Sequence, residues 1–238
     1  DFKGEIDEIH LLKINNAIII QRYLYKNRII LEDYVHTHGV KFYTKLKARL
    51  KAFFYWKVDG EIDKAIWALD TWSNGYYHWL TDFIPRCISA HAYWKDYPVL
   101  IPSFYLSLNY ISETFKIFPF KVHPYSIYGS FKVKELIVPS RIVASECDPS
   151  QIKLVRSYFR EHDKHENVKT KKIYISRRKS QRRKIINELE LETALENLGF
   201  ETWCLEDLSF EEQRKLMYQT GILVSNHGAG LTNLIFMP

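Results

Sequence analysis

The sequence predicts an α/β protein made of two Rossmann-like domains, and two observations lead to this prediction. Short apolar, β-branched runs alternate with segments of helical periodicity along most of the 238 residues. Residues 140–150 are the best candidate for a hinge between two such domains, and Pro149 and Ser150 at its end suit a helix start. The expected domains are therefore residues 1–145 and 146–238.

In the first domain, β-branched and aromatic residues predict strands within Ala17–Leu31 and at Ile66–Thr71, Val99–Pro102 and Glu135–Pro139. The basic, aromatic stretch Lys41–Trp56 is typical of an amphipathic helix, which either packs on the core or contacts an anionic surface.

Helices are expected after the turn at Gly75 and around Leu106–Phe118. In the first of them, apolar residues from Trp79 to Ile88 recur at helical spacing, and Pro85 should kink or interrupt the helix.

The second domain repeats the alternation. Strands are predicted at Lys172–Ser176, Phe200–Leu205 and Gly221–Ser225, and helices at Gln151–His162, Asn187–Leu198 and Ser209–Thr220. The second helix should turn Leu189, Leu195 and Leu198 inward and end at Gly199, and a Ser-x-x-Glu capping box should open the third. Because the pattern stops at Pro238, we expect this domain to be incomplete as given.

The composition fits a globular, basic protein. Hydrophobic residues make up 46%, and no run of about 18 apolar residues occurs. The net charge of +6 permits nucleotide phosphates, nucleic acid or an anionic membrane face as partners. Cys87, Cys147 and Cys204 form neither a CxxC pair nor a metal-binding spacing, which favours a reducing compartment. We therefore expect a cytoplasmic protein, with peripheral contact to the inner face of the membrane as a further expectation.

The segment Asn226–Asn233, with the sequence NHGAGLTN, carries the strongest signal for a ligand. Gly228 and Gly230 follow a predicted strand and precede a helix, so backbone N–H groups there can approach an anion closely. The alternative from spacing alone is a tight strand-to-helix turn without a ligand.

A second signal is the basic loop Ser176–Lys184, which holds six cations and no acid at the end of a predicted strand. Arginine forks match phosphate oxygens, and ligands of open α/β sheets bind at the carboxyl ends of strands. The alternatives are a solvated loop or a patch for RNA or membrane. Because both loops fall at strand ends of one domain, they are expected to converge on a pyrophosphate.

A third signal is the pair His78 and Asp82, which share one face of the predicted helix at i and i+4. An imidazole and a carboxylate so placed suit a general base and its orienting partner. The alternative is that both buttress the helix; Asp70 is a further carboxylate that could serve. No GxSxG, HExxH or DxD motif occurs, so a route without a metal or cofactor is expected.

Four segments together resemble glycosyltransferase family 61, which includes xylosyl- and O-linked N-acetylglucosaminyltransferases and surface-polysaccharide proteins. They are YYHWLTDFIPR (76–86), YISRRKSQRRKIINELEL (174–191), GFETWCLEDLSFEEQ (199–213) and LVSNHGAGLTNLIFMP (223–238). The resemblance runs from about Asp70 to the end of the chain. Its specificity lies in the order and spacing of the four.

The resemblance implies a GT-B arrangement, with a cleft between the two domains. It implies inverting, metal-independent transfer from a nucleotide sugar, UDP-sugar favoured, to a glycan or lipid-linked acceptor, as in capsular polysaccharide synthesis; no nucleic acid is involved. His78 or Asp82 would be the base. The implied donor-binding set is Arg177, Arg178, Arg183, Asn187, Glu188, His227, Gly228, Ala229, Gly230, Leu231, Thr232 and Asn233. The alternatives are a non-catalytic nucleotide-sugar or glycan-binding module and a basic RNA- or membrane-binding protein.

Overall fold

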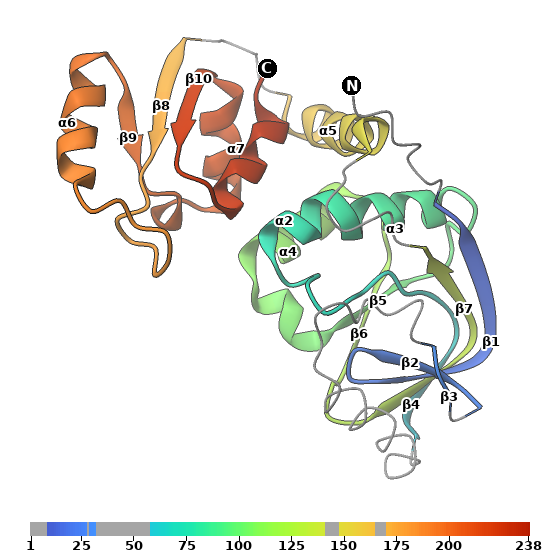
Figure 1. The fold of residues 1–238 in the computed structure, drawn as a ribbon. Coiled ribbons are helices and arrows are strands. Elements are labelled where there is room, and N and C mark those ends of the chain that lie inside the picture. Colours follow the sequence, from blue (N-terminus) through green and yellow to red (C-terminus); the bar gives the residue numbers. More distant parts are fainter. Residues whose placement is uncertain (1–8, 28, 32–57, 141–147, 165–169) are drawn as a thin grey trace, which may run out of the picture. The chain divides into compact units, whose positions relative to one another are not determined.

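The computed structural model describes residues 9–27, 29–31, 58–140, 148–164 and 170–238. The chain forms two compact units, Asp1–Ile152 and Lys153–Pro238, each with a β-sheet of its own (Figure 1). The domain boundary expected at residue 145 and the helix expected at Lys41–Trp56 lie outside the described residues. Within those residues, no helix is both long and apolar enough to cross a membrane.

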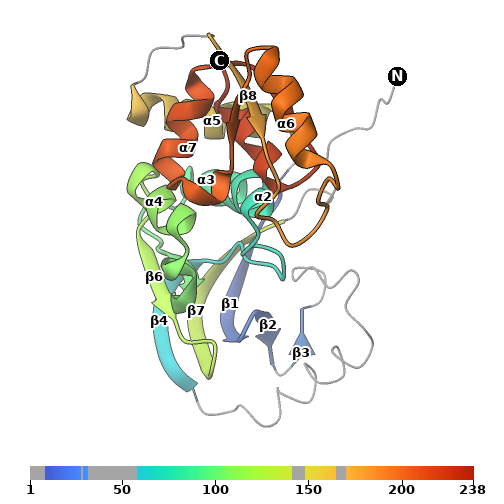
Figure 2. The same ribbon diagram turned by 90° about the vertical axis from the view of Figure 1, so that its left-hand side faces the viewer.

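The sheet of the first unit is mixed and has seven strands in the order β3-β2-β1-β7-β4-β5-β6. Figure 2 shows β1 between β2 and β7. Strands β7, β4, β5 and β6 are parallel neighbours, whereas β1 runs antiparallel to β7 and β2, and β2 to β3. The bounds are β1 Leu11–Ile20, β2 Tyr23–Lys26, β3 Ile29–Ile30, β4 Val58–Ile66, β5 Val99–Pro102, β6 Val122–Tyr125 and β7 Ser130–Pro139.

This sheet confirms an α/β unit but corrects the expected Rossmann-like pattern, because half of its pairings are antiparallel. The two residues between β1 and β2 form a tight hairpin in which Gln21 has a φ of 59°. Hairpins of this length require such a positive φ, which glycine or asparagine usually supplies. Glutamine at this position hides the hairpin from sequence analysis.

The strand expected at Ile66–Thr71 is wrong in its bounds, because β4 ends at Ile66. The apolar residues that follow, Trp67 to Leu69, are fully buried but lie outside any strand. They carry the chain from the carboxyl end of β4 into the turn at residues 71–74.

The helical segment after this turn has three parts: α2 Tyr76–His78, a π-helical turn Trp79–Phe83, and α3 Ile84–His91. The N–H of Ile84 bonds to the carbonyl of Trp79, five residues back. Pro85 has no N–H to give to an α-helical ladder, so the interruption predicted for it is confirmed. The helix expected at Leu106–Phe118 is the 3-10 turn Ser103–Ser107 followed by α4 Asn109–Ile117.

The buried Arg86 fixes α3 to the sheet. Its Nε and Nη2 donate to the carbonyl of Pro139 at 3.3 and 2.8 Å, at the carboxyl end of β7. The segment that carries His78 is therefore anchored beside the carboxyl ends of the parallel strands.

The second unit has a parallel sheet of three strands in the order β10-β8-β9, as a Rossmann-like unit requires. The helix α5 Pro149–Asp163 begins at the end of the first unit and continues into the second. The other elements of the second unit are β8 Lys171–Ile175, α6 Glu188–Asn197, β9 Glu201–Trp203, the 3-10 turn η4 Leu205–Asp207, α7 Phe210–Tyr218, β10 Thr220–Ser225 and the 3-10 helix η5 Ala229–Phe236.

The strand order places a switch point between β8 and β10. The connection from β8 to β9 runs in one direction across the sheet, and that from β9 to β10 runs back past β8. Right-handed connections then put α6 and α7 on opposite faces. At such a point the loops after neighbouring strands part and leave a crevice where ligands bind.

Two helix ends are as predicted, but the orientation of α6 is not. Ser209 and Glu212 form the capping box of α7, and Gly199 has a φ of 82° just after α6. The expectation that Leu189 and Leu198 turn inward is wrong, because they are 72% and 63% exposed, whereas Leu195 is half-buried and Glu188 and Glu192 are buried. A buried carboxylate on a surface helix needs specific partners, so the polar face of α6 has a role of its own.

A buried ion pair joins α5 to α7. Asp163 accepts hydrogen bonds from Nε and Nη2 of Arg214 at 2.8 and 2.9 Å and from the hydroxyl of Tyr218 at 3.0 Å. Burial alone raises the pKa of Asp163, but the hydrogen bonds from Arg214 and His162 outweigh it and hold that pKa below its usual value.

We expect this pair to make the stability of the protein depend on pH. A carboxyl group with a lowered pKa stabilises the fold fully above its unfolded value of about 3.9, and the effect fades as the pH falls through the folded pKa. In urea unfolding, Asp163→Asn should be less stable than wild type by a constant amount at pH 7 and 5, and the difference should shrink below about pH 4. The exposed pair of Lys179 and Asp207 provides the control, Asp207→Asn, with little expected change. A difference for Asp163→Asn that persists undiminished at pH 3 would contradict the assignment.

Candidate functional site

Two loops of the second unit meet at the carboxyl edge of its sheet, as predicted. The first follows β8 and the second, residues 226–228, follows β10. The side-chain amide of Asn226 donates to the carbonyl of Arg183 at 3.0 Å, and Nη1 of Arg183 lies 2.6 Å from Nδ1 of His227. The structure thus brings the basic loop and the glycine-bearing segment together.

The contact between Arg183 and His227 selects one tautomer of the imidazole. A guanidinium has only donors, so Nδ1 of His227 must accept and the ring proton must sit on Nε2. The side chain of His227 is exposed, which leaves the Nε2–H free to donate to a ligand. Arg183 itself has a φ of 58°, and strain of this kind concentrates at functional sites.

Arg177 lies against the backbone of Gly228. Its Nη2 donates to the hydroxyl of Ser180 at 2.7 Å and to the carbonyl of Arg182 at 3.1 Å. A Cβ atom on Gly228 would come within 1.8 Å of Nη1 of Arg177. Gly228 is therefore required by the close approach of a guanidinium, and its extended φ of 172° places no demand for glycine.

The rest of the glycine-bearing segment divides into an exposed and a buried part. Ala229 is exposed and Gly230 and Leu231 are half-buried, whereas Thr232 and Asn233 are buried. The amide of Asn233 donates to Oε1 of Gln213 on α7 at 3.1 Å, so this side chain faces the unit's interior. A Cβ on Gly230 would lie 3.2 Å from Cδ1 of Leu205.

Glu188 holds the start of the basic loop. Its Oε1 accepts hydrogen bonds from the hydroxyls of Tyr174 and Ser176 at 3.0 and 2.8 Å and from the N–H of Arg177 at 2.6 Å. Burial raises the pKa of Glu188, but these three bonds and the charge of Arg178 outweigh it, so the pKa is lowered overall. Glu188 is therefore a carboxylate at neutral pH.

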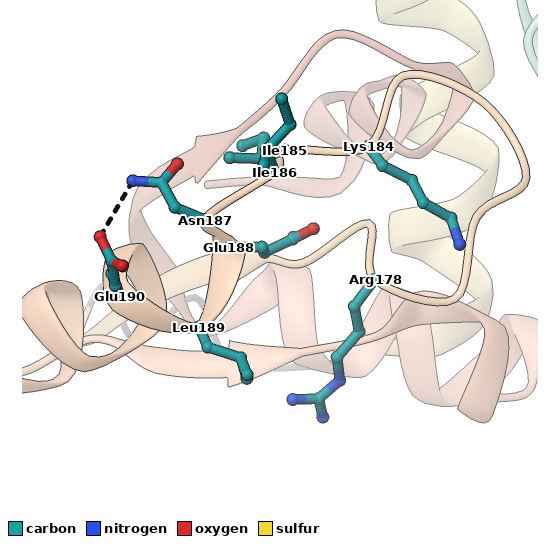
Figure 3. A pocket seen from close by; sticks show the side chains of 8 residues that line it. All are labelled: Arg178, Lys184, Ile185, Ile186, Asn187, Glu188, Leu189 and Glu190. Atoms are coloured by element: carbon teal, nitrogen blue, oxygen red, sulfur yellow. Dashed lines mark hydrogen bonds between the residues drawn. The ribbon is translucent and has the colours of Figure 1, made fainter.

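A cavity of about 350 Å³ lies beside this carboxylate (Figure 3). Arg178, which lines it, donates to Oε2 of Glu192 at 2.9 Å, and Asn187 donates to Oε2 of Glu190 at 3.2 Å. The remaining lining residues are Lys184, Ile185, Ile186, Glu188, Leu189 and Glu190.

In the first unit, His78 lines a cavity of about 310 Å³ together with Trp72, Asn74 and Gly75. The imidazole lies 5.2 Å from the ring of Trp72, which is 40% exposed. Sequence analysis did not single out Trp72, although an aromatic residue beside the turn Ser73-Asn74-Gly75 at a strand's carboxyl end was a usable signal. Among the described residues that line this cavity, His78 is the titratable one.

The two carboxylates considered as catalytic groups near His78, those of Asp82 and Asp70, both make contacts that support the fold. Oδ1 of Asp82 lies 3.7 Å from Nη1 of the buried Arg86, and Asp82 does not line the cavity. Asp70 is buried, and its Oδ1 accepts hydrogen bonds from the N–H of Trp72 at 2.7 Å and the hydroxyl of Ser73 at 3.1 Å. Asp70 thus shapes the turn that presents Trp72 and His78.

No group of three or more His, Cys, Asp or Glu side chains within the described ranges is placed to hold a metal ion. A metal-independent reaction stays a prediction.

Comparison with known proteins gives a family match over most of the chain. The model of the family described as Glycosyltransferase 61 matches residues 76–238. A stretch of 72 residues is 36% identical to the EGF domain-specific O-linked N-acetylglucosamine transferases of Bos taurus and Rattus norvegicus, and 33% identical to that of Gallus gallus. Each match covers 28% of this chain and only 14% of the relative.

Proposed function

The chain belongs to glycosyltransferase family 61, and from this premise we propose that it transfers a sugar from a nucleotide-sugar donor to a hydroxyl of a glycan or lipid-linked acceptor. The observation that carries the proposal is the meeting of Arg177, Arg183 and His227 at the switch point of the second unit. Two guanidinium groups and an imidazole N–H at that place suit a diphosphate. We further propose a UDP-sugar as donor, a GT-B arrangement of the two units, and a role in surface or capsular polysaccharide synthesis.

In the proposed reaction, an acceptor hydroxyl attacks the anomeric carbon on the face opposite the nucleotide. The bond between that carbon and the diphosphate oxygen breaks, and its electron pair leaves with the nucleoside diphosphate. Arg177, Arg183 and the Nε2–H of His227 stabilise the negative charge that develops there, so neither a metal nor a cofactor is needed. Attack from the opposite face inverts the anomeric configuration.

The acceptor's proton goes to a base of the first unit. We assign this role to His78, because it lines a cavity beside an exposed tryptophan. The face of Trp72 offers an apolar platform against which a sugar ring can pack. Asp82 and Arg86 then hold the helical segment that carries the base.

Replacing Arg183 should test the donor site most directly. Arg183→Ala should weaken the binding of UDP about ten- to a hundredfold, because a hydrogen bond to a charged group is lost. Calorimetry with UDP, GDP and CMP measures the effect, and UDP-N-acetylglucosamine is the first sugar donor to assay because the named relatives are N-acetylglucosamine transferases.

Arg182→Ala is the matched control, since it removes an equal charge from the neighbouring position of the same loop. Its affinity for UDP should fall much less. Equal losses in both variants would indicate a diffuse electrostatic effect and would count against the assigned site. Binding without turnover of any sugar donor would favour the non-catalytic module.

A further inference from the structure

Glu188 has one carboxylate oxygen that its structural role does not use. Oε1 alone accepts all three hydrogen bonds that hold the basic loop. Oε2 is buried and has no hydrogen-bond partner within the described part of the chain, and the side chain as a whole is only 6% exposed. A buried, ionised oxygen without a donor is costly, so such an atom calls for an explanation.

This carboxylate lines the cavity beside the basic loop. Figure 3 shows the side chain of Glu188 extending into the space between the segments that carry Lys184 and Arg178. Ile185, Ile186 and Leu189 give the cavity apolar lining, and Ile186 is fully exposed to solvent. An apolar wall, two cations and two carboxylates, of which that of Glu190 is paired with Asn187, in about 350 Å³ match the mixed chemistry of a nucleoside attached to a phosphate.

We propose that this cavity binds the nucleoside of the donor and that Oε2 of Glu188 accepts a hydrogen bond from a ribose hydroxyl. The proposal rests on the function proposed above. A ribose presents two neighbouring hydroxyl donors, and an acidic side chain after a strand of a Rossmann-like sheet is a known partner for such a group. The exposed Ile186 and Leu189 then cover part of the base. The positive charges of Arg178 and Lys184 offset the repulsion between the Glu188 carboxylate and the phosphates of the nucleotide.

The same carboxylate would thus do two tasks. Through Oε1 it positions the N–H of Arg177, and through Oε2 it reads the sugar of the nucleotide. These two tasks account for the inward side chain of Glu188 at the start of α6, where the neighbouring Leu189 faces the solvent.

The test compares ribonucleotides with their deoxy counterparts on the full chain. Calorimetry should show that UDP binds about ten- to a hundredfold more tightly than 2′-deoxy-UDP or 3′-deoxy-UDP, with GDP and its deoxy forms measured in parallel. In Glu188→Gln the amide oxygen can keep the three bonds of Oε1, while an uncharged amide nitrogen replaces Oε2. The ratio between ribo- and deoxynucleotide should then fall at least about fivefold, since a charge-assisted bond is lost.

Glu192→Gln is the matched control. Glu192 lies one turn further along α6 with an equal exposure of 6%, and it does not line the cavity. Its ribo-to-deoxy ratio should equal that of wild type.

Equal binding of UDP and both deoxy forms to wild type would overturn the inference and leave the proposed function standing. So would a ribose preference that survives in Glu188→Gln. If no nucleotide binds wild type at all, the proposed function fails and this inference falls with it. The wild-type comparison decides the matter even if the variant does not fold.

Discussion

Replacing His78 with alanine is expected to lower the rate of sugar transfer about 10²- to 10⁴-fold, the usual contribution of a general base. Affinity for UDP should stay unchanged, because the residues proposed to bind it belong to the second unit. Transfer assays at saturating donor and calorimetry with UDP separate the two effects. This division between turnover and nucleotide affinity distinguishes a base from a residue that only supports the fold.

Two controls sharpen the result. His123→Ala removes another imidazole from the same unit, on β6, and should leave the transfer rate near that of wild type. Asp82→Asn removes the alternative base, and because Asp82 lies beside the buried Arg86, thermal unfolding must accompany the assay. A rate lost in Asp82→Asn and kept in His78→Ala, with both variants folded, would reverse the two assignments.

Replacing Gly228 with alanine is expected to weaken UDP binding about a hundredfold, through the combined loss of two charge-assisted hydrogen bonds from one guanidinium. The added methyl group would sit 1.8 Å from Nη1 of Arg177, so the flexible guanidinium must leave its place. The backbone at Gly228 is extended, and alanine adopts that conformation without strain. Calorimetry with UDP measures the effect, and thermal unfolding should change little.

A double-mutant cycle with Arg177→Ala identifies the cause. If Gly228 only makes room for Arg177, the alanine at 228 should cost nothing further once the arginine is gone. An undiminished second loss would show that Gly228 contacts the nucleotide through its own backbone. Gly230 is a poorer probe, since a larger side chain there would press on the buried Leu205 and disturb packing as well as binding.

The parts of the fold that follow from hydrophobic periodicity and turn chemistry were predictable. The parallel strands of the second unit, the capping box at Ser209 and the positive φ at Gly199 each depend on a few neighbouring residues. The convergence of the two loops was predictable as well, because both follow strands of one parallel sheet. The resemblance of the two loops to a known family suggested roles for their residues, but it gave no information about distances or contacts.

What could not be predicted depends on contacts between distant residues. The inward glutamates of α6 defy periodicity because Glu188 is drawn inside by Tyr174, Ser176 and the N–H of Arg177. The close approach of Arg177 to Gly228 joins residues about 50 positions apart, and no local pattern announces it. The sequence did not reveal that Asp82 lies beside Arg86 instead of in the cavity with His78. Spacing alone shows which residues share a helix face, but it does not show which of them line a cavity.

The direction in which the side chain of His78 points depends on the number of residues in the π-helical turn Trp79–Phe83. This turn accommodates one more residue than an α-helical turn would between His78 and the anchored Arg86. Each residue of an α-helix rotates the chain by about 100° around the helix axis. Deleting one residue from this turn would therefore rotate the imidazole by about a quarter-turn around that axis, away from its present direction. The number of residues in this short stretch therefore determines where the imidazole points, and the site depends on that number as much as on the presence of a histidine at position 78.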